Sequence, residues 1–235
     1  MACILNIETS TRVCSVALSL DGQCIYSDVD KDGPSHSVSC GVFVQNALSF
    51  ANSHAIPVDA VAVSRGPGSY TGLRIGYSMA KGVAYGYGIP LINVDTLSLL
   101  CVPVLLKHCD LPDDALLVPM IDARRMEVYS AVYDRSLSVL RGVQADVVAE
   151  GAYSEYSEQR PVYYFGDGSD KCVDVLNREG MHHIPGILPL ASNMYPLSER
   201  AFLQKQYADV AYDEPFYLKE FQATRSKNLL QEVMK

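Results

Sequence analysis

The sequence predicts an α/β protein with mixed β-sheets, and three observations lead to this class. Residues 2–108 alternate short β-type runs with helical patterns in the order βββαβαβα. A polar, proline-containing break over residues 110–113 follows, and more strand-like runs come after it. The composition, 49% hydrophobic and 20% charged in a chain of 235 residues, is that of a globular protein long enough to bury a core.

The N-terminal part begins as an antiparallel meander. Strands are expected over residues 2–8, 13–20 and 23–28, because turn residues separate these apolar runs. A helix is expected from Ser35, an N-cap candidate, to residue 52, since its apolar residues recur at helical spacing. The remaining elements alternate between the two types: a strand over 58–64, a helix over 71–87, a strand over 89–94 and a helix over 96–108.

The break over residues 110–113 divides the chain into a first lobe, residues 1–109, and a second lobe, residues 110–235. The second lobe also begins with strand-like runs, which suggests that the two lobes are related. A helix over about residues 196–209 is a candidate to pack back on the first lobe. The other expected elements are strands over 116–121, 126–133, 138–148 and 162–165, and a polar loop over 153–160.

Charge and cysteine usage exclude several classes of protein. The net charge of −8 and the isoelectric point near 5.1 argue against a nucleic-acid-binding surface belonging to this chain alone. Seven cysteines form no CxxC pair and no metal-binding spacing, so they are expected as reduced structural thiols. No apolar run reaches the roughly 18 residues that span a bilayer. The N-terminus lacks a basic leader and carries Glu8, so a cytoplasmic protein without membrane contact is expected.

The most distinctive stretch is SRGPGSYTGLRIG, residues 64–76, which suggests a phosphate-binding loop at first. A Walker A loop needs a lysine after its last glycine, and Leu73 stands there instead. A dinucleotide fingerprint needs its third glycine at the position of Thr71. Two interpretations remain: Gly66 and Gly68 supply a sharp turn, or the turn and the helix start contact a phosphate.

The helix behind this turn carries a small residue at every fourth position: Gly72, Gly76, Ala80 and Ala84. Each helical glycine costs roughly 1 kcal/mol relative to alanine, so the ridge indicates close approach of another backbone. That backbone belongs either to the helix over residues 35–52 or to another subunit. Tyrosines nearby, of a type enriched at interfaces, suit the second alternative.

Five stretches of the chain carry a recognisable pattern: ILNIETSTRVCSVAL, SRGPGSYTGLRIGYSMAKGVAYGYGIPLI, DARRMEVYSAVYD, FGDG and PFYLKEF. Together they closely resemble the TsaB (YeaZ) family. The resemblance implies the two-lobed ASKHA fold of actin, Hsp70 and sugar kinases. It also implies a role in making threonylcarbamoyladenosine on tRNAs that read ANN codons, as partner of a TsaD-type catalytic subunit and a TsaE-type ATPase.

The resemblance also identifies the positions where catalysis would lie. The ASKHA phosphate element DxGT reads Glu8-Thr9-Ser10-Thr11 here, with a serine in place of the glycine. Thr96 and Leu100 stand where TsaD-type proteins carry a histidine pair, and neither can replace an imidazole ligand. No metal site and no catalytic residue is therefore expected. The candidates for a phosphate or nucleotide contact are Glu8, Ser10, Thr11, Gly66 and Gly68.

The sequence thus predicts a non-catalytic scaffold without a cofactor of its own, with ATP or ADP near the shared interface and tRNA contacted only indirectly. A homodimer is expected when the partner is absent. One rival is a stand-alone ASKHA enzyme with degenerate motifs, either a phosphotransferase or a glycoprotease-like metallopeptidase, and another is a plain homodimeric structural protein. The expected partner-binding residues are Cys40, Val44, Ala47, Gly72, Leu73, Gly76, Tyr77, Ala80 and Ala84.

Overall fold

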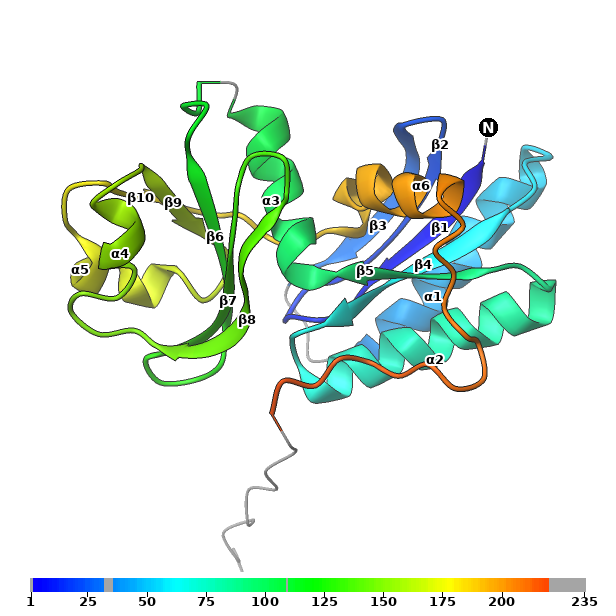
Figure 1. Cartoon of the computed structure of the whole chain (residues 1–235). Helices are drawn as coiled ribbons and strands as arrows, with labels where there is room; N and C mark the ends of the chain where they lie inside the picture. Colours follow the sequence, from blue (N-terminus) through cyan, green and yellow to red (C-terminus); the bar gives the residue numbers. More distant parts are fainter. Residues whose placement is uncertain (1, 32–35, 109, 220–235) are drawn as a thin grey trace, which may run out of the picture.

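The computed structural model describes residues 2–31, 36–108 and 110–219, and it shows two lobes side by side (Figure 1). The first lobe holds a five-stranded sheet of order β3-β2-β1-β4-β5. β1 pairs antiparallel with β2 and parallel with β4, so the sheet is mixed as predicted. Its strands are β1 (Cys3–Glu8), β2 (Cys14–Leu20), β3 (Gln23–Asp30), β4 (Ala60–Gly66) and β5 (Leu91–Asp95).

The second lobe repeats this topology. Its sheet has the order β10-β9-β6-β7-β8, in which β6 takes the place of β1 between an antiparallel and a parallel neighbour. The connections from β1 to β2 and from β6 to β7 are therefore equivalent turns. The strands are β6 (Leu116–Asp122), β7 (Glu127–Tyr133), β8 (Val139–Val147), β9 (Val162–Phe165) and β10 (Met181–Ile184).

Alternation along β1 explains how the first sheet is covered on both faces. Leu5 and Ile7 face the helices α1 (His36–Ser53) and α2 (Tyr70–Tyr87), whereas Ile4 faces α3 (Thr96–Lys107) and α6 (Tyr195–Leu203). Both faces are buried, and four of the six residues of β1 are apolar, while the polar Asn6 and Glu8 are buried with hydrogen-bond partners. The predicted N-cap Ser35 lies outside the described residues.

Helix α3 joins the two lobes. Its Leu99 and Val102 pack in the first lobe, while Leu97 and Leu100 pack in the second. Most of α3 is buried, which accounts for its largely apolar sequence, whereas Leu106 and Lys107 in its last turn are exposed. Within the described part of the chain, no helix has both the length and the apolar character needed to cross a membrane.

Two expectations for the second half were wrong in detail. The polar loop over 153–160 contains a one-turn helix, α4 (Ser154–Ser157), because Tyr153 is buried and anchors it. The helix predicted to reach residue 209 ends at Leu203, and Ala208 then donates its N–H to the carbonyl of Leu91 at the edge of the first sheet. Residues that pair with a sheet edge must be extended, so the helix stops before them.

More of the C-terminal part packs on the first lobe than the single helix that was predicted to do so. The short η2 (Ala191–Asn193) and α6 both pack against the first sheet. Residues 208–219, which we name the tail segment, then run beside α2 toward the second lobe (Figure 1). The remaining helical pieces are η1 (Asp170–Cys172) and α5 (Val173–Leu176) in the second lobe.

Candidate functional site

A cleft of about 1300 Å³ lies between the lobes. The two equivalent turns, β1–β2 and β6–β7, line it together with the start of α2 and the end of the tail segment. Of the five residues predicted to contact a phosphate, Ser10, Thr11 and Gly68 line the cleft, whereas Glu8 and Gly66 do not. The fold thus brings part of the predicted set to one place.

Glu8 is buried next to Ser10, which lines the cleft. The Glu8 side chain is fully buried, and its Oε1 accepts hydrogen bonds from the Ser10 N–H at 2.6 Å and the Ser10 hydroxyl at 2.5 Å. Its Oε2 accepts from the Ser64 hydroxyl. Burial raises the pKa of Glu8 from 4.5 to about 7, against the lowering effect of the Ser10 bonds. The Glu8 carboxyl group thus links the end of β1 to β4 by hydrogen bonds, and both of its oxygens are occupied inside the protein.

Glycines let the first turn and α2 come into contact. A side chain at Gly68 would place its Cβ 2.4 Å from the Ser10 carbonyl oxygen, and one at Gly72 would come 2.1 Å from that of Thr9. The Ser69 N–H also donates to the Ser10 carbonyl at 2.6 Å. The space behind the turn is therefore filled by protein. The phosphate interpretation of Gly66 and Gly68 gains no support here, and both glycines serve close packing.

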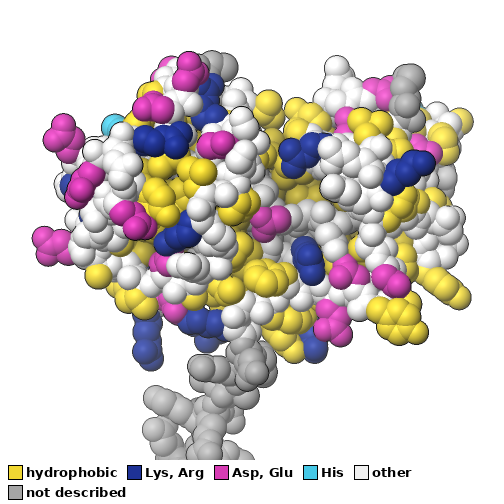
Figure 2. Space-filling view, viewed as in Figure 1, with side chains coloured by type: hydrophobic (Ala, Val, Ile, Leu, Met, Phe, Trp, Pro, Cys, Tyr) yellow, Lys and Arg dark blue, Asp and Glu magenta, His cyan; other side chains and the backbone are white. Residues whose placement is uncertain are grey.

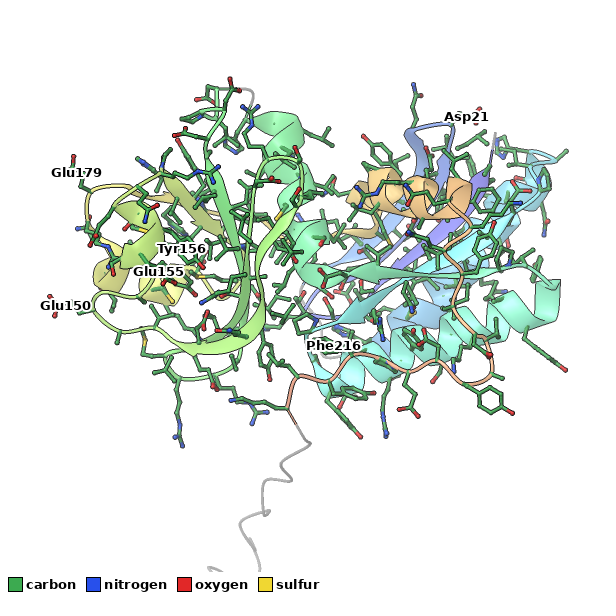
Figure 3. All side chains as sticks on the ribbon, viewed as in Figure 1. Asp21, Glu150, Glu155, Tyr156, Glu179 and Phe216 are labelled. Carbon is green, nitrogen blue, oxygen red and sulfur yellow. The ribbon has the colours of Figure 1, made fainter. Side chains whose placement is uncertain are left out.

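Gly66 is explained by the tail segment. It has a φ of 120°, and a Cβ there would lie 2.5 Å from the carbonyl oxygen of Phe216. The Phe216 N–H donates to the Arg65 carbonyl at 2.8 Å, which fixes the crossing of the two backbones. Figure 3 shows Phe216 where the first lobe meets the second. Gly66, which the sequence suggested as part of a phosphate loop, is thus needed so that the tail segment can pack against β4.

No metal site is found among the described residues, where no three potential ligands gather. Thr96 and Leu100, which were weighed as possible metal-ligand positions, are both fully buried in the protein interior. The adjacent histidines of β10 diverge, since the rings of His182 and His183 stack on Tyr163 and Tyr164 respectively. The six described cysteines are free thiols, and only Cys24 is exposed.

The nine residues predicted to bind a partner do not form an outer surface. Gly72 and Gly76 are buried, and a Cβ at Gly76 would lie 2.2 Å from the Thr9 hydroxyl oxygen. The small-residue ridge therefore contacts the β1–β2 turn and the sheet, which corrects its interpretation as the docking face. The other seven are 0–4% exposed within the first lobe: Cys40, Val44, Ala47, Leu73, Tyr77, Ala80 and Ala84.

The opposite face of α2 carries a second ridge of small residues, Ser78, Gly82 and Gly86. All three are exposed and line a shallow apolar groove of about 840 Å³ that also includes Ser37 of α1, together with Met79 and Val83. A Cβ at Gly82 or Gly86 would meet no atom within 4 Å. We name this surface the α1–α2 groove. Figure 2 shows hydrophobic side chains along the lower edge of the first lobe, where α2 lies.

Sequence reasoning missed Gly82 and Gly86, although the signal was present. They repeat at four residues, as Gly72 and Gly76 do, but half a helix turn away. Spacing alone cannot tell which of two such ridges faces the core. Tyr87, which lines the groove, is 53% exposed, and α1 also carries the exposed apolar residues Val38 and Val42.

Known proteins resemble this chain along nearly its whole length. A family model described as "TsaD: tRNA N6-adenosine threonylcarbamoyltransferase" matches residues 32–211. The tRNA threonylcarbamoyladenosine biosynthesis protein TsaB of Escherichia coli K12 is 30% identical over 222 residues, covering 92% of this chain and 94% of the relative. A solved structure of YeaZ from Pseudomonas aeruginosa has a TM-score of 0.78 at 23% identity, covering 93% of this chain and 100% of that one.

A sugar kinase shares the fold at greater distance. The inorganic polyphosphate/ATP-glucomannokinase from an Arthrobacter species has a TM-score of 0.50 at 10% identity, over 86% of this chain and 100% of that one. Two mixed sheets of the same strand order, covered by helices, are the architecture predicted for actin-like and sugar-kinase-like proteins. The prediction of an ASKHA fold with two related lobes is confirmed.

Proposed function

The chain belongs to the TsaB family of tRNA threonylcarbamoyladenosine biosynthesis proteins, and on that premise we propose that it is a non-catalytic subunit supporting a TsaD-type catalytic subunit. The proposal includes a TsaE-type ATPase as third component and ATP or ADP near the shared interface. A non-catalytic role is supported by Glu8, the acidic residue of the phosphate element, because both of its carboxyl oxygens accept hydrogen bonds from Ser10 and Ser64 inside the protein.

The observation that carries the proposal is the open space at Gly82 and Gly86. Each glycine costs the helix roughly 1 kcal/mol relative to alanine. Gly72 and Gly76 are explained by contacts inside the protein, but nothing within the described chain lies within 4 Å of a Cβ at Gly82 or Gly86. Small residues along an i±4 row permit a second helix to pack closely. We assign the α1–α2 groove to that second helix.

A TsaD-type subunit is the occupant that this groove suits best. The TsaD family model matches residues 32–211, which include α1 and α2, so a TsaD-type chain carries corresponding helices. Two such helix pairs can pack face to face about an approximate two-fold axis. The same geometry allows a second copy of this chain to occupy the groove when no partner is present, and the two occupants should then exclude each other.

Replacing Gly82 and Gly86 by leucine is expected to weaken association with the TsaD-type subunit by at least about tenfold, which is about 1.4 kcal/mol. Leucine side chains would hold the partner helix away, while the fold keeps its internal contacts. Isothermal titration calorimetry of the two purified subunits measures the change. Homodimer formation, which light scattering measures, should decrease in the same variant.

The matched control is Gly142→Leu on β8, which is exposed and also has no atom within 4 Å of a Cβ. This variant should bind as the unmodified chain does. Unchanged affinity of the Gly82→Leu/Gly86→Leu variant would contradict the assignment of the groove. Turnover of ATP by the purified chain alone would instead favour a stand-alone enzyme.

A further inference from the structure

Arginines without acidic partners stand on both sides of the interlobe cleft. Arg12 lies in the β1–β2 turn, and Arg124 and Arg125 lie in the equivalent β6–β7 turn, and all three are exposed and line the cleft. Throughout residues 2–31, 36–108 and 110–219, none of their side chains makes an ion pair or a hydrogen bond. We name these three residues the arginine rim.

Two of the three acidic residues that line the cleft are paired with lysines. Asp122 pairs with Lys171, and Glu127 pairs with Lys219 of the tail segment at 2.5 Å. Asp167 accepts the Asp122 N–H at 3.2 Å, and burial raises its pKa to about 6. The arginine rim therefore presents uncompensated positive charge, although the whole chain carries a net charge of −8. Such local charge attracts anions.

Aromatic rings line the same cleft as the arginine rim. The rings of Tyr70 and Tyr217 pack with centroids 4.7 Å apart, and Arg74 lies over the Tyr70 ring at 4.5 Å. Tyr70, Tyr129 and Tyr217 all line the cleft. Arginines for phosphates together with aromatic rings for bases are the combination that binds single-stranded nucleic acid.

The shape of the cleft favours a chain of phosphates over one deeply inserted nucleotide. Its inner end is filled where Ser10 and Thr9 contact Gly68 and Gly72, so no recess is left behind the turn for a di- or triphosphate. The arginines stand instead at the exposed margin, distributed over two lobes. A polyanion that crosses from one lobe to the other can contact both groups of arginines.

We propose that the arginine rim binds the phosphate backbone of a single-stranded RNA segment, with a base stacked against the Tyr70–Tyr217 pair. The inference rests on the proposed function, because tRNA is the substrate of the pathway. It replaces the expectation that tRNA is contacted only indirectly. Arg124 and Arg125 have φ of 73° and 51°, an uncommon conformation for residues other than glycine, and both lie in the β6–β7 turn.

The test titrates a fluorescein-labelled tRNA anticodon stem–loop into the full-length chain at several KCl concentrations from about 50 to 200 mM. The variant Arg124→Ala/Arg125→Ala is expected to bind at least about tenfold more weakly at the lowest salt. Its plot of log Kd against log salt should be shallower by about 0.7 for each phosphate that the variant no longer neutralises. Arg12→Ala should act in the same direction.

The control is Arg200→Ala/Lys205→Ala, which removes two exposed cations on or just after α6, away from the cleft. It should bind the stem–loop as the unmodified chain does. Tyr217→Ala should weaken binding while leaving the salt slope unchanged, because stacking releases no counterions.

Three results would overturn the inference. The first is equal binding by the arginine-rim variants and the control. The second is complete displacement of the stem–loop by ADP, which would identify a site for free nucleotides. The third is equal affinity for a fully paired RNA duplex. Association with the TsaD-type subunit is measured in parallel. Arginine-rim variants should keep it, whereas the Gly82→Leu/Gly86→Leu variant should show weakened association and unchanged RNA binding, so the two proposals fail separately.

Discussion

Replacing Gly72 by alanine is expected to destabilise the protein by about 3 kcal/mol, the upper end of the usual cost of overpacking. The new Cβ would lie 2.1 Å from the backbone carbonyl oxygen of Thr9. A carbonyl in the turn between β1 and β2 cannot rotate away as a flexible side chain would. Either α2 or the turn must move, and both carry other contacts, including the Thr9 hydroxyl bond to the Gly72 carbonyl at 2.8 Å. Urea unfolding followed by circular dichroism measures the loss.

Gly82→Ala in the same helix is the matched control. It meets no atom within 4 Å, so it should stabilise the protein by roughly 0.5–1 kcal/mol, through the better helix propensity of alanine. Glycine-to-alanine substitutions in α2 should therefore change the free energy of unfolding in opposite directions on the two faces of the helix. Equal effects of the two substitutions would show that α2 does not contact the β1–β2 turn in solution.

Replacing Glu8 by glutamine is expected to stabilise the protein by up to about 3 kcal/mol above pH 7. Burial raises the pKa of Glu8 from 4.5 to about 7, and a shift of that size corresponds to about 3 kcal/mol. The folded chain keeps a proton that the unfolded chain releases. The contribution of Glu8 to stability is therefore complete below pH 4.5 and is lost as the pH rises to 7. Glutamine has no charge to bury, so this loss disappears.

The measurement is the free energy of unfolding of both proteins from pH 4.5 to 8. Asp167 and Asp95, whose pKa values burial also raises, are present in both proteins and contribute the same slope to each. Glu8→Ala separates charge from structure, because it leaves the Ser10 N–H and the Ser64 hydroxyl without their acceptor and should destabilise at every pH. Parallel pH curves for Glu8→Gln and the unmodified chain would contradict the raised pKa.

The order of strands and helices in the first lobe could be predicted from sequence, because each element carries a local signal. Helix α2 was expected over residues 71–87 and spans Tyr70–Tyr87. β4 was expected over residues 58–64 and spans Ala60–Gly66, and its apolar centre, residues 60–63, lies in both ranges. Such patterns depend on neighbouring residues only, and they survive folding unchanged.

The candidate site was less predictable, because its contacts join residues far apart in the chain. The partner of Gly72 is Thr9, 63 residues earlier, and the partner of Gly66 is Phe216 in the tail segment. The spacing of glycines in a helix indicates that another part of the chain packs closely against it, but it does not show which element that is. For the same reason, the helix predicted to end at residue 209 was too long: its end depends on the pairing of Ala208 with Leu91.

The two ridges of α2 also separate two kinds of natural variation. Residues on its inner face determine whether the first lobe folds, since they contact the β1–β2 turn and the sheet. Residues at Ser78, Gly82 and Gly86 lie on the outer face, and a Cβ at either glycine there would meet nothing inside the described chain. Mutations on the outer face can therefore accumulate without loss of folding. Substitutions at these positions can therefore change which partner the α1–α2 groove binds while the fold of the first lobe stays the same.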